Sequence, residues 1–417
     1  MNSKNKLSIA LLTSLFFFWG FIHNLDPILI PHLRNAFNLS HLQSSFIDSS
    51  VYVAYFFMAI PAGIIMRKAG YKNGIISGLL LFGIGCFLFV PAANSISYPF
   101  FLTALFIVAC GLTTLETAAN PYVAVLGDPE KGPQRLNFAQ SFNGLAAFLA
   151  PIIGGKFILT NHVITPEELS KLSDTARRLY IQSETSTVKM PYVILGIIIL
   201  ILAAVFYFVK LPSINQNNSN TNNIFQALKI KNVKSAITAQ FFYIGAQVCI
   251  LSFIVVFATE VVKINSDNAP KYAGYAGLAF LLGRFFGTFL MRFFNATKLL
   301  IYFSLIAFLL TIYIVTGQGI TTLFAIIGVA FCMSIMYPTI FALGIQGAGN
   351  ETESVSSLIV MSIVGGAVLP PLLGWISDKT GIFQWGYVVP AFCFLIVLIF
   401  AIKNRNYTLR ENKIGGH

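Results

Sequence analysis

The chain has little charge for its size. Only 10% of its 417 residues are Asp, Glu, Lys or Arg, while 56% are hydrophobic. A soluble domain normally carries about 25% charged residues, which help to cover its water-exposed surface. The apolar residues are also spread along the whole chain rather than gathered in one segment. The composition therefore excludes a soluble globular protein and predicts a bundle of membrane-spanning helices.

Cysteine and histidine are also scarce, with five of each. All five cysteines lie within apolar runs and none is in CxxC spacing, so we interpret them as reduced packing residues. No cluster of ligand residues points to a metal site, and we expect neither a metal ion nor a cofactor. The first apolar run starts near Leu7 and lacks a cleavage site of small residues. We therefore expect that run to be the first helix and not a signal peptide.

What the sequence does contain is a series of long apolar runs. A helix of about 20 apolar residues spans the hydrocarbon core of a membrane. The stretch 211–233 is polar and low in complexity at its start, which is typical of a flexible linker. We predict an all-α membrane protein of about twelve transmembrane helices. Their apolar runs fall near residues 8–30, 46–66, 73–91, 99–121, 136–159, 191–210, 236–259, 271–291, 298–316, 320–344, 354–375 and 384–403.

The distribution of Lys and Arg predicts the orientation of these helices. Basic residues are enriched in the cytoplasmic loops of membrane proteins. If both termini are cytoplasmic, most of the 27 basic residues lie on the inner side. The others gather mainly in the long 160–190 loop, where the charge rule is weak. We therefore expect a multi-pass protein of the bacterial inner membrane with both termini in the cytoplasm. The net charge of +12 follows from this topology, so we expect no nucleic-acid partner.

Four short motifs occur twice, in the same order, at separations of 217 to 225 residues. A nearly constant separation indicates a duplicated six-helix unit. We predict an N-terminal half over 1–210, a cytoplasmic linker over 211–233 and a C-terminal half over 234–417. Two such parallel halves are the architecture of major facilitator transporters, whose substrates bind near the midplane between the halves. The motifs are Phe17-Phe-Trp-Gly20 with Phe242-Tyr-Ile-Gly245, Gly63-x-x-x-Arg67-Lys68 with Gly287-x-x-x-Met291-Arg292, Pro121-x-x-x-x-Leu126-Gly127 with Pro338-x-x-x-x-Leu343-Gly344, and Leu149-Ala-Pro151-Ile-Ile-Gly154 with Leu369-Pro-Pro371-Leu-Leu-Gly374.

Glu116 is the clearest functional candidate inside a predicted helix. It lies in the apolar segment 111–120, with no basic residue within two turns. An ionisable group at this depth is expensive and usually faces a cavity or a partner. A carboxyl that gains and loses a proton there can carry the proton between the two sides of the membrane. The alternative is a permanently protonated carboxyl that serves only as a structural hydrogen-bond donor.

Amide side chains suggest a binding cavity in the first half. Gln140 and Asn143 lie three residues apart and share a helix face. Their amides combine donors and acceptors, which suits sugar hydroxyls, although hydrogen bonding between helices is an alternative role. Asn24 and Asp26 precede Pro27, which breaks the helical bonding of the first helix. These two side chains either line the same cavity or form a rim at the membrane interface.

Further candidates lie near the middle of other helices. The ring of Trp19 either stacks on the apolar face of a sugar or packs against neighbouring helices. Gln247 and Tyr337 are the polar candidates of the second half. Together with the amides, these residues define the predicted substrate-binding set.

Three basic residues are predicted to have gating or structural roles. Arg284 lies in the inner half of the eighth predicted helix, where we expect it to pair with a carboxylate or with the ends of neighbouring helices. Arg67 and Lys68 belong to a basic turn on the inner side, between the second and third helices. We interpret that turn as a conformational and topological element rather than a site of chemistry.

Several blocks of the sequence match a known family in detail. They are 115–127 (LETAANPYVAVLG), 135–143 (RLNFAQSFN), 239–247 (AQFFYIGAQ), 283–288 (GRFFGT) and 333–344 (MSIMYPTIFALG). They resemble the fucose–proton symporters, which are sugar transporters of the major facilitator superfamily, and the resemblance runs from about residue 10 to 403. It implies that Glu116 is the proton-coupling carboxyl. It also implies that the sugar cavity is lined by Trp19, Asn24, Gln140, Asn143 and Tyr337.

The first helix departs from the family pattern. The fucose symporters carry an essential aspartate there, directly after an Asn-Leu-Asn run. A gap-free reading from Trp19 places Pro27 at that position, one residue after Asp26. One residue is about 100° of helix rotation, but a proline loosens the local helix. Asp26 therefore remains a candidate second proton-coupling residue, and otherwise Glu116 couples alone.

The residues and the resemblance together predict proton-coupled symport of a neutral monosaccharide, L-fucose or a close hexose, by alternating access. No Arg or Lys is expected beside the amides near the midplane, so an anionic sugar would lack a counter-charge. The nearest alternative is a glucose/galactose transporter of the same family with sodium coupling or none. A membrane-embedded hydrolase would need a nucleophile–base or metal cluster, and a sugar sensor would need a signalling domain. We expect neither, and hence no enzyme. The expected partners are a small-molecule sugar, protons and the lipid bilayer, and we expect a monomer.

Overall fold

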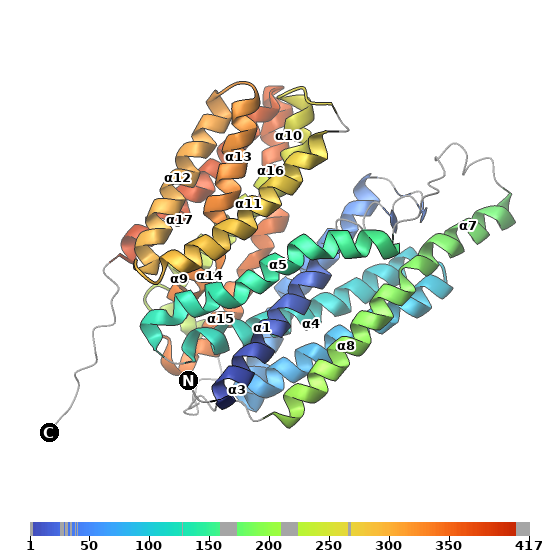
Figure 1. Cartoon of the computed structure of the whole chain (residues 1–417), viewed down its shortest axis with the longest axis horizontal. Coiled ribbons are helices and arrows are strands. Elements are labelled where there is room, and N and C mark those ends of the chain that lie inside the picture. Colours follow the sequence, from blue (N-terminus) through green and yellow to red (C-terminus); the bar gives the residue numbers. More distant parts are fainter. Residues whose placement is uncertain are drawn as a thin grey trace. The chain divides into compact units, whose positions relative to one another are not determined.

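The structure is a computed structural model that describes residues 3–25, 29, 32–33, 36–37, 39, 41–126, 128–158, 173–209, 224–265 and 268–405. Most of these residues are helical, and the described part contains no strand (Figure 1). The helices are α1 (Ser3–His23), α3 (His41–Asn94), α4 (Tyr98–Val125), α5 (Gly132–Ile158), α7 (Asp174–Thr187), α8 (Lys189–Phe208), α9 (Val233–Ser252), α10 (Ile254–Glu260), α11 (Ala269–Leu290), α12 (Ala296–Thr316), α13 (Ile320–Met333), α14 (Met336–Ile345), α15 (Thr352–Met361), α16 (Gly365–Thr380) and α17 (Val388–Lys403).

Nine segments of the described chain are long and apolar enough to cross a membrane. One of them, Ser49–Asn94, contains both the second and the third predicted helices, and each of the other eight contains one. The first and fifth predicted helices correspond to α1 and α5. All twelve predicted runs therefore have a helical counterpart. The prediction of an all-α membrane protein with about twelve spanning helices is confirmed.

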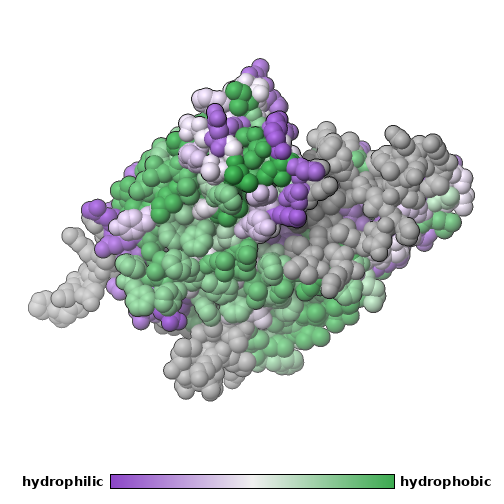
Figure 2. All heavy atoms as spheres, turned by 45° about the horizontal axis from the view of Figure 1, so that its top comes forward, coloured by the Kyte–Doolittle hydropathy of each residue, from purple (hydrophilic) through white to green (hydrophobic). Residues whose placement is uncertain are grey.

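The surface fits a lipid environment. Figure 2 shows broad hydrophobic areas over the helices, with hydrophilic residues gathered in smaller groups. Large apolar side chains are exposed on several of the helices, among them Phe208, Leu309, Phe324 and Phe392. A water-soluble monomer rarely exposes apolar patches of more than a few hundred Å². These exposed side chains suit a surface in contact with lipid.

Gly70 interrupts α3 at the basic turn. Its φ of 84° lies in the left-handed region, which glycine adopts without the steric cost of a Cβ. Arg67 is half-buried and Lys68 is exposed just before this break. After it, Lys72 donates from Nζ to the main-chain carbonyl of Tyr207, 2.7 Å away near the end of α8. The predicted turn between the second and third helices is thus a break at a single residue.

Three helices that were predicted as single segments are interrupted. The seventh is divided into α9 and α10 at Phe253, and the tenth into α13 and α14 at Ser334 and Ile335. The eleventh is divided into α15 and α16 by the 3-10 turn Ser362–Val364. An interruption leaves carbonyl groups without their intrahelical donors, and inside a membrane they must find other partners. At the break between α13 and α14, side chains of two neighbouring helices supply them.

Part of the predicted 160–190 loop is helical. Helix α7 begins where the Ser173 hydroxyl accepts a hydrogen bond from the main-chain N–H of Ala176, at 3.3 Å. Serine is a favoured N-cap, and no glycine or proline follows within α7. The prediction of a loop is therefore wrong for residues 174–187. Residues 159–172 lie outside the described part of the chain.

A buried histidine and a buried glutamate meet at α7. His32 Nε2 lies 3.0 Å from the main-chain oxygen of Glu184, and His32 Nδ1 lies 3.6 Å from its carboxylate. Thr187 donates to the main-chain oxygen of Ile158 at 3.0 Å, at the end of α5. These contacts attach α7 to the segment that follows α1 and to α5.

By its internal contacts, the chain forms two compact units. The segments are Met1–Ala119 with Phe142–Ser213 in the first unit, and Asn120–Ser141 with Ile214–His417 in the second. Residues 120–141 therefore pack with the C-terminal helices. They comprise the C-terminal end of α4, the N-terminal part of α5 and the connection between the two helices. The linker predicted between the halves at 211–233 remains a prediction, and residues 211–223 of it lie outside the described part.

Each unit contains a close helix crossing at a repeated glycine. In the first unit, a Cβ on Gly20 of α1 would lie 2.8 Å from Cα of Asn143 on α5. In the second unit, a Cβ on Gly245 of α9 would collide with the Leu369 side chain of α16. Small residues allow helices to approach closely in a membrane. The first and fifth helices of each unit thus meet at the glycine of the same sequence motif, as a duplication predicts.

Candidate functional site

Glu116 lies on α4 in the interior of the first unit. Residues 111–124 are all buried, and Glu116 is 3% exposed. The phenol of Tyr55, on α3, shares a hydrogen bond with the Glu116 carboxyl and is also buried. A phenol can donate to a carboxylate and can accept from a carboxylic acid. This pair can therefore satisfy the Glu116 side chain both with and without its proton.

The indole of Trp19 lies beside the same pair. Trp19 of α1 is 7% exposed and lies close to the Tyr55 phenol. The indole N–H is directed at the Tyr55 hydroxyl, and the phenol therefore lies between the indole and the Glu116 carboxyl. The three side chains form one buried polar group within the first unit.

The other predicted residues of α1 lie at its end. Asn24 is half-buried, and its Nδ2 donates to the main-chain oxygen of Gly20 at 2.7 Å. Asn143 is also half-buried and lies against Gly20 at the crossing of α1 and α5. Asp26 and Pro27 lie outside the described residues, so the departure from the family pattern stays untested.

A buried chain of amide and phenol groups lies in the second unit. Gln140 Nε2 donates to Asn120 Oδ1 at 3.1 Å, and Asn120 Nδ2 donates to the Tyr337 hydroxyl at 3.4 Å. Gln140 is 3% exposed, Asn120 is 0% exposed and Tyr337 is 7% exposed. The structure thus joins two predicted binding residues, Gln140 and Tyr337, through a third residue that the sequence analysis did not single out.

Arg284 binds main-chain oxygens at depth. Its Nε donates to the Ser334 oxygen at the break between α13 and α14, and its Nη1 donates to the Gln140 oxygen, both at 2.9 Å. Its guanidinium also lies 4.6 Å from the centre of the Phe280 ring. Of the two kinds of partner expected for Arg284, the structure shows a helix end.

This contact corrects one part of the sequence analysis. A guanidinium does lie beside one of the amide residues, because α11 carries Arg284 to the main chain of Gln140. These two residues are far apart in sequence, so local spacing could not reveal the approach. At least two of the five N–H groups of Arg284 are directed at main-chain oxygens.

Gln247 is the polar candidate of α9. It is half-buried and has no hydrogen bond to another described residue. Tyr243, which was not predicted, lies one turn before it on the same helix. The Tyr243 hydroxyl donates to the main-chain oxygen of Met333 at 2.9 Å, at the break beside Arg284. The motif that surrounds it, residues 239–247, was the available signal.

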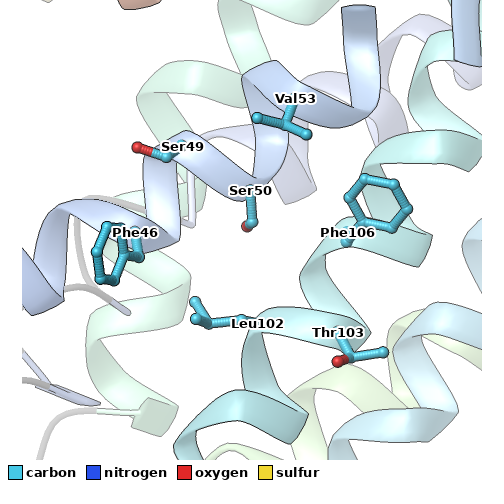
Figure 3. Close-up of a pocket in the computed structure, with 7 residues that line it drawn as sticks. All are labelled: Phe46, Ser49, Ser50, Val53, Leu102, Thr103 and Phe106. Atoms are coloured by element: carbon cyan, nitrogen blue, oxygen red, sulfur yellow. The ribbon is translucent and has the colours of Figure 1, made fainter. Parts of the chain in front are cut away.

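A hollow between α3 and α4 is separate from these residues. It has a volume of about 370 Å³ and is shallow and open (Figure 3). Its serine and threonine hydroxyls do not provide a polar site, because Ser50 and Thr103 bond to carbonyls of their own helices. The lining residues are Phe46, Ser49, Ser50, Val53, Leu102, Thr103 and Phe106. None of them belongs to the predicted binding set.

Comparison with known proteins decides the family. The family described as Major Facilitator Superfamily matches residues 8–363. The chain belongs to the major facilitator superfamily. Its resemblance to the fucose–proton symporters is confirmed as well. The chain is 39% identical over 404 residues to the L-fucose-proton symporter of Escherichia coli K12, which covers 95% of this chain and 92% of that protein.

A second relative and a solved structure are also similar to this chain over nearly its whole length. It is 33% identical over 407 residues to a glucose/galactose transporter of Brucella abortus, covering 96% of this chain and 95% of that protein. The crystal structure of the transporter FucP in the outward conformation matches with a TM-score of 0.89 and 39% identity. That match covers 96% of this chain and 99% of the FucP chain.

In the part of this chain that the structure describes, no group of three His, Cys, Asp or Glu residues could hold a metal ion.

Proposed function

We propose that this chain is a proton-coupled symporter of a neutral monosaccharide in a bacterial inner membrane, with L-fucose or a close hexose as its substrate. The observation that carries the proposal is the buried pair of Glu116 and Tyr55 in a chain 39% identical to a protein named as an L-fucose-proton symporter. The protein works as a transporter, and both termini lie in the cytoplasm. It functions as a monomer.

The proton step rests on Glu116. A carboxyl inside a membrane protein is most stable there without charge. Glu116 accepts a proton when the site is open to the outside, and sugar binding together with this proton permits the transition to the cytoplasmic side. Release of both resets the carrier. Tyr55 stabilises the carboxylate by donation after the proton has left. Asp26 is a second candidate for this role.

The sugar step rests on amide and aromatic side chains. Amides pair with hydroxyls as donors and acceptors, and an aromatic face packs against the C–H groups of a sugar. The position of Trp19 supports this role, since its ring lies beside the Tyr55 phenol that bonds to Glu116. The proposed sugar-binding residues are Trp19, Asn24, Gln140, Asn143, Gln247 and Tyr337.

A glucose/galactose transporter is the second candidate. The relative in Brucella abortus, at 33% identity, is named for those sugars. One difference between the substrates of the two candidates lies at C6, which is a methyl in fucose and a hydroxymethyl in glucose and galactose. An apolar wall discriminates between such groups by roughly 1–3 kcal/mol. The coupling ion also differs, because this second candidate uses sodium or no ion.

Sugar-induced proton uptake tests both candidates. Each sugar is added to energy-depleted cells that express the protein, and the external pH is recorded. We expect alkalinisation with L-fucose or galactose-configured sugars. We expect no response to glucuronate or sugar phosphates, because the Arg284 guanidinium is directed at main-chain oxygens and an anion would lack another counter-charge. Sodium-dependent sugar uptake without alkalinisation would favour the second candidate. A glucuronate response larger than that to L-fucose would refute the neutral-sugar proposal, and Arg284 would then be the first cation to examine.

A further inference from the structure

Asn120 occupies a central place in the buried amide chain of the second unit. Its side-chain oxygen accepts from Gln140 Nε2 at 3.1 Å, and its side-chain nitrogen donates to the Tyr337 hydroxyl at 3.4 Å. Asn120 itself is fully buried. Both of its partners belong to the proposed sugar-binding set. A single amide therefore contacts two proposed ligand-binding side chains that come from different helices, α5 and α14.

We propose that Asn120 is a positioning residue for the sugar: it fixes the orientation of Gln140 and Tyr337 without touching the substrate. This inference rests on the proposed function, because it concerns the side chains assigned there to sugar binding. Binding sites depend on side chains whose orientations are already fixed by supporting hydrogen bonds. Such preorganisation removes ordering costs from the binding step.

The direction of the hydrogen bonds determines which side-chain atom of Gln140 is available to a sugar hydroxyl. Because Asn120 Oδ1 accepts from Gln140 Nε2, the amide nitrogen of Gln140 points at Asn120. Its Oε1 is then directed to the opposite side of the amide group, where it can accept from a sugar hydroxyl. The main chain of Gln140 is held as well, since its carbonyl accepts from Arg284. Asn120 thus fixes the one part of Gln140 that the main-chain contact leaves able to rotate.

The two hydrogen bonds of Asn120 differ in strength. The bond to Gln140 has a normal length, whereas the 3.4 Å bond to Tyr337 is long and therefore weaker. Orientation of Gln140 is thus the larger contribution. Replacing Asn120 should mainly reproduce the loss of Gln140, and only to a smaller extent the loss of the Tyr337 hydroxyl.

The chain offers a matched control at Asn137. This amide is also fully buried in the second unit, on α5, and it donates to Pro133 and to the Thr339 hydroxyl, at 2.9 and 3.1 Å. Asn137 therefore has the same chemistry and burial as Asn120, but its side chain bonds to neither Gln140 nor Tyr337. A loss caused by removing any buried amide would appear in both variants.

The experiment measures binding of L-fucose, with D-galactose as a second probe, to purified full-length protein in detergent. Asn120→Ala should weaken binding about tenfold, whereas Asn137→Ala should change it less than about threefold. Asn120→Asp keeps the volume and the acceptor for Gln140 but loses the amide donor to Tyr337, so we expect an intermediate loss. If the alanine variant misfolds, this near-isosteric variant still tests the proposal. Thermal unfolding of each variant shows whether it is folded.

Coupling to Gln140 separates a positioning role from a purely structural one. In a Gln140→Ala background, Asn120→Ala should weaken binding by less than about a further twofold, because the side chain that Asn120 orients is already absent. Fully additive losses, or equal effects of the variants at 120 and 137, would overturn the inference. If the wild-type protein binds neither sugar, the proposed function fails and the positioning role fails with it. Wild-type binding with an unaffected Asn120→Ala variant rejects the positioning role alone.

Discussion

At the scale of the residue, the protein combines a carboxyl, a phenol and an indole in one buried group. Glu116 and Tyr55 share a hydrogen bond, and the Trp19 indole lies beside the phenol. One part of this group can exchange a proton, and another part offers an aromatic ring. A proton and a polar ligand can thus both be accommodated within a small region of the first unit.

Glu116→Gln tests the proton step. The amide resembles the protonated acid, so we expect the variant to lose uphill sugar accumulation driven by a proton gradient. It should retain counterflow of pre-loaded sugar, because exchange does not require the proton to leave. Accumulation and counterflow are measured in proteoliposomes with L-fucose. We expect uphill accumulation to fall at least tenfold, about 1.4 kcal/mol in barrier terms.

Glu184→Gln is the matched control for that variant. Glu184 is a second buried carboxyl of the first unit, but it meets His32 at α7. This variant should keep proton-driven accumulation. A Glu116→Gln protein that still concentrates sugar in response to a pH gradient would show that the coupling group lies elsewhere, with Asp26 as the next candidate.

At the scale of the element, helix breaks and close crossings position the polar groups. The break between α13 and α14 exposes main-chain oxygens that Tyr243 and Arg284 bind. The crossing of α9 and α16 is equally tight, since a Cβ on Gly365 would collide with the main-chain oxygen of Phe241. Main-chain atoms within a helix cannot move aside as a flexible side chain can.

Gly365→Ala should therefore destabilise the second unit by about 1–3 kcal/mol, which is the usual cost of overpacking a close contact. Thermal unfolding in detergent measures the effect. Gly374→Ala is the control on the same helix, because nothing lies within 4 Å of a Cβ built there. We expect that variant to be neutral or slightly more stable. Equal unfolding temperatures for the two variants would contradict the crossing geometry.

The sequence predicted the helices well and their interruptions poorly. Long apolar runs specify spanning helices whatever their contacts, so each predicted run has a counterpart in the structure. A break such as that at Ser334 depends on side chains that reach it from other helices, and no local pattern signals those. Glu116 was visible because a carboxylate in an apolar run is rare. Tyr55 was not, because tyrosine is common in such runs. Asn120 lay inside a block already recognised, one turn after Glu116, but its partners come from α5 and α14.

At the scale of the whole molecule, the distribution of basic residues predicts the orientation in the membrane. Most Lys and Arg residues fall on one side if both termini are cytoplasmic. We expect a fluorescent protein fused after the last residue to be bright and alkaline phosphatase at the same place to be inactive. Fusions within 159–172, in the predicted outer loop, should behave in the opposite way. Active phosphatase at the C-terminus would reverse the proposed topology.

The contacts of Arg284 have a consequence for the medium in which the protein works. This cation is held by two main-chain oxygens from different helices, and amide oxygens do not titrate in the range of pH that a bacterium meets. The attachment of α11 to α5 and to the end of α13 therefore keeps the same strength in acid and in alkaline surroundings. A carrier driven by a proton gradient benefits from such hydrogen bonds, because these contacts between helices do not weaken when the pH changes.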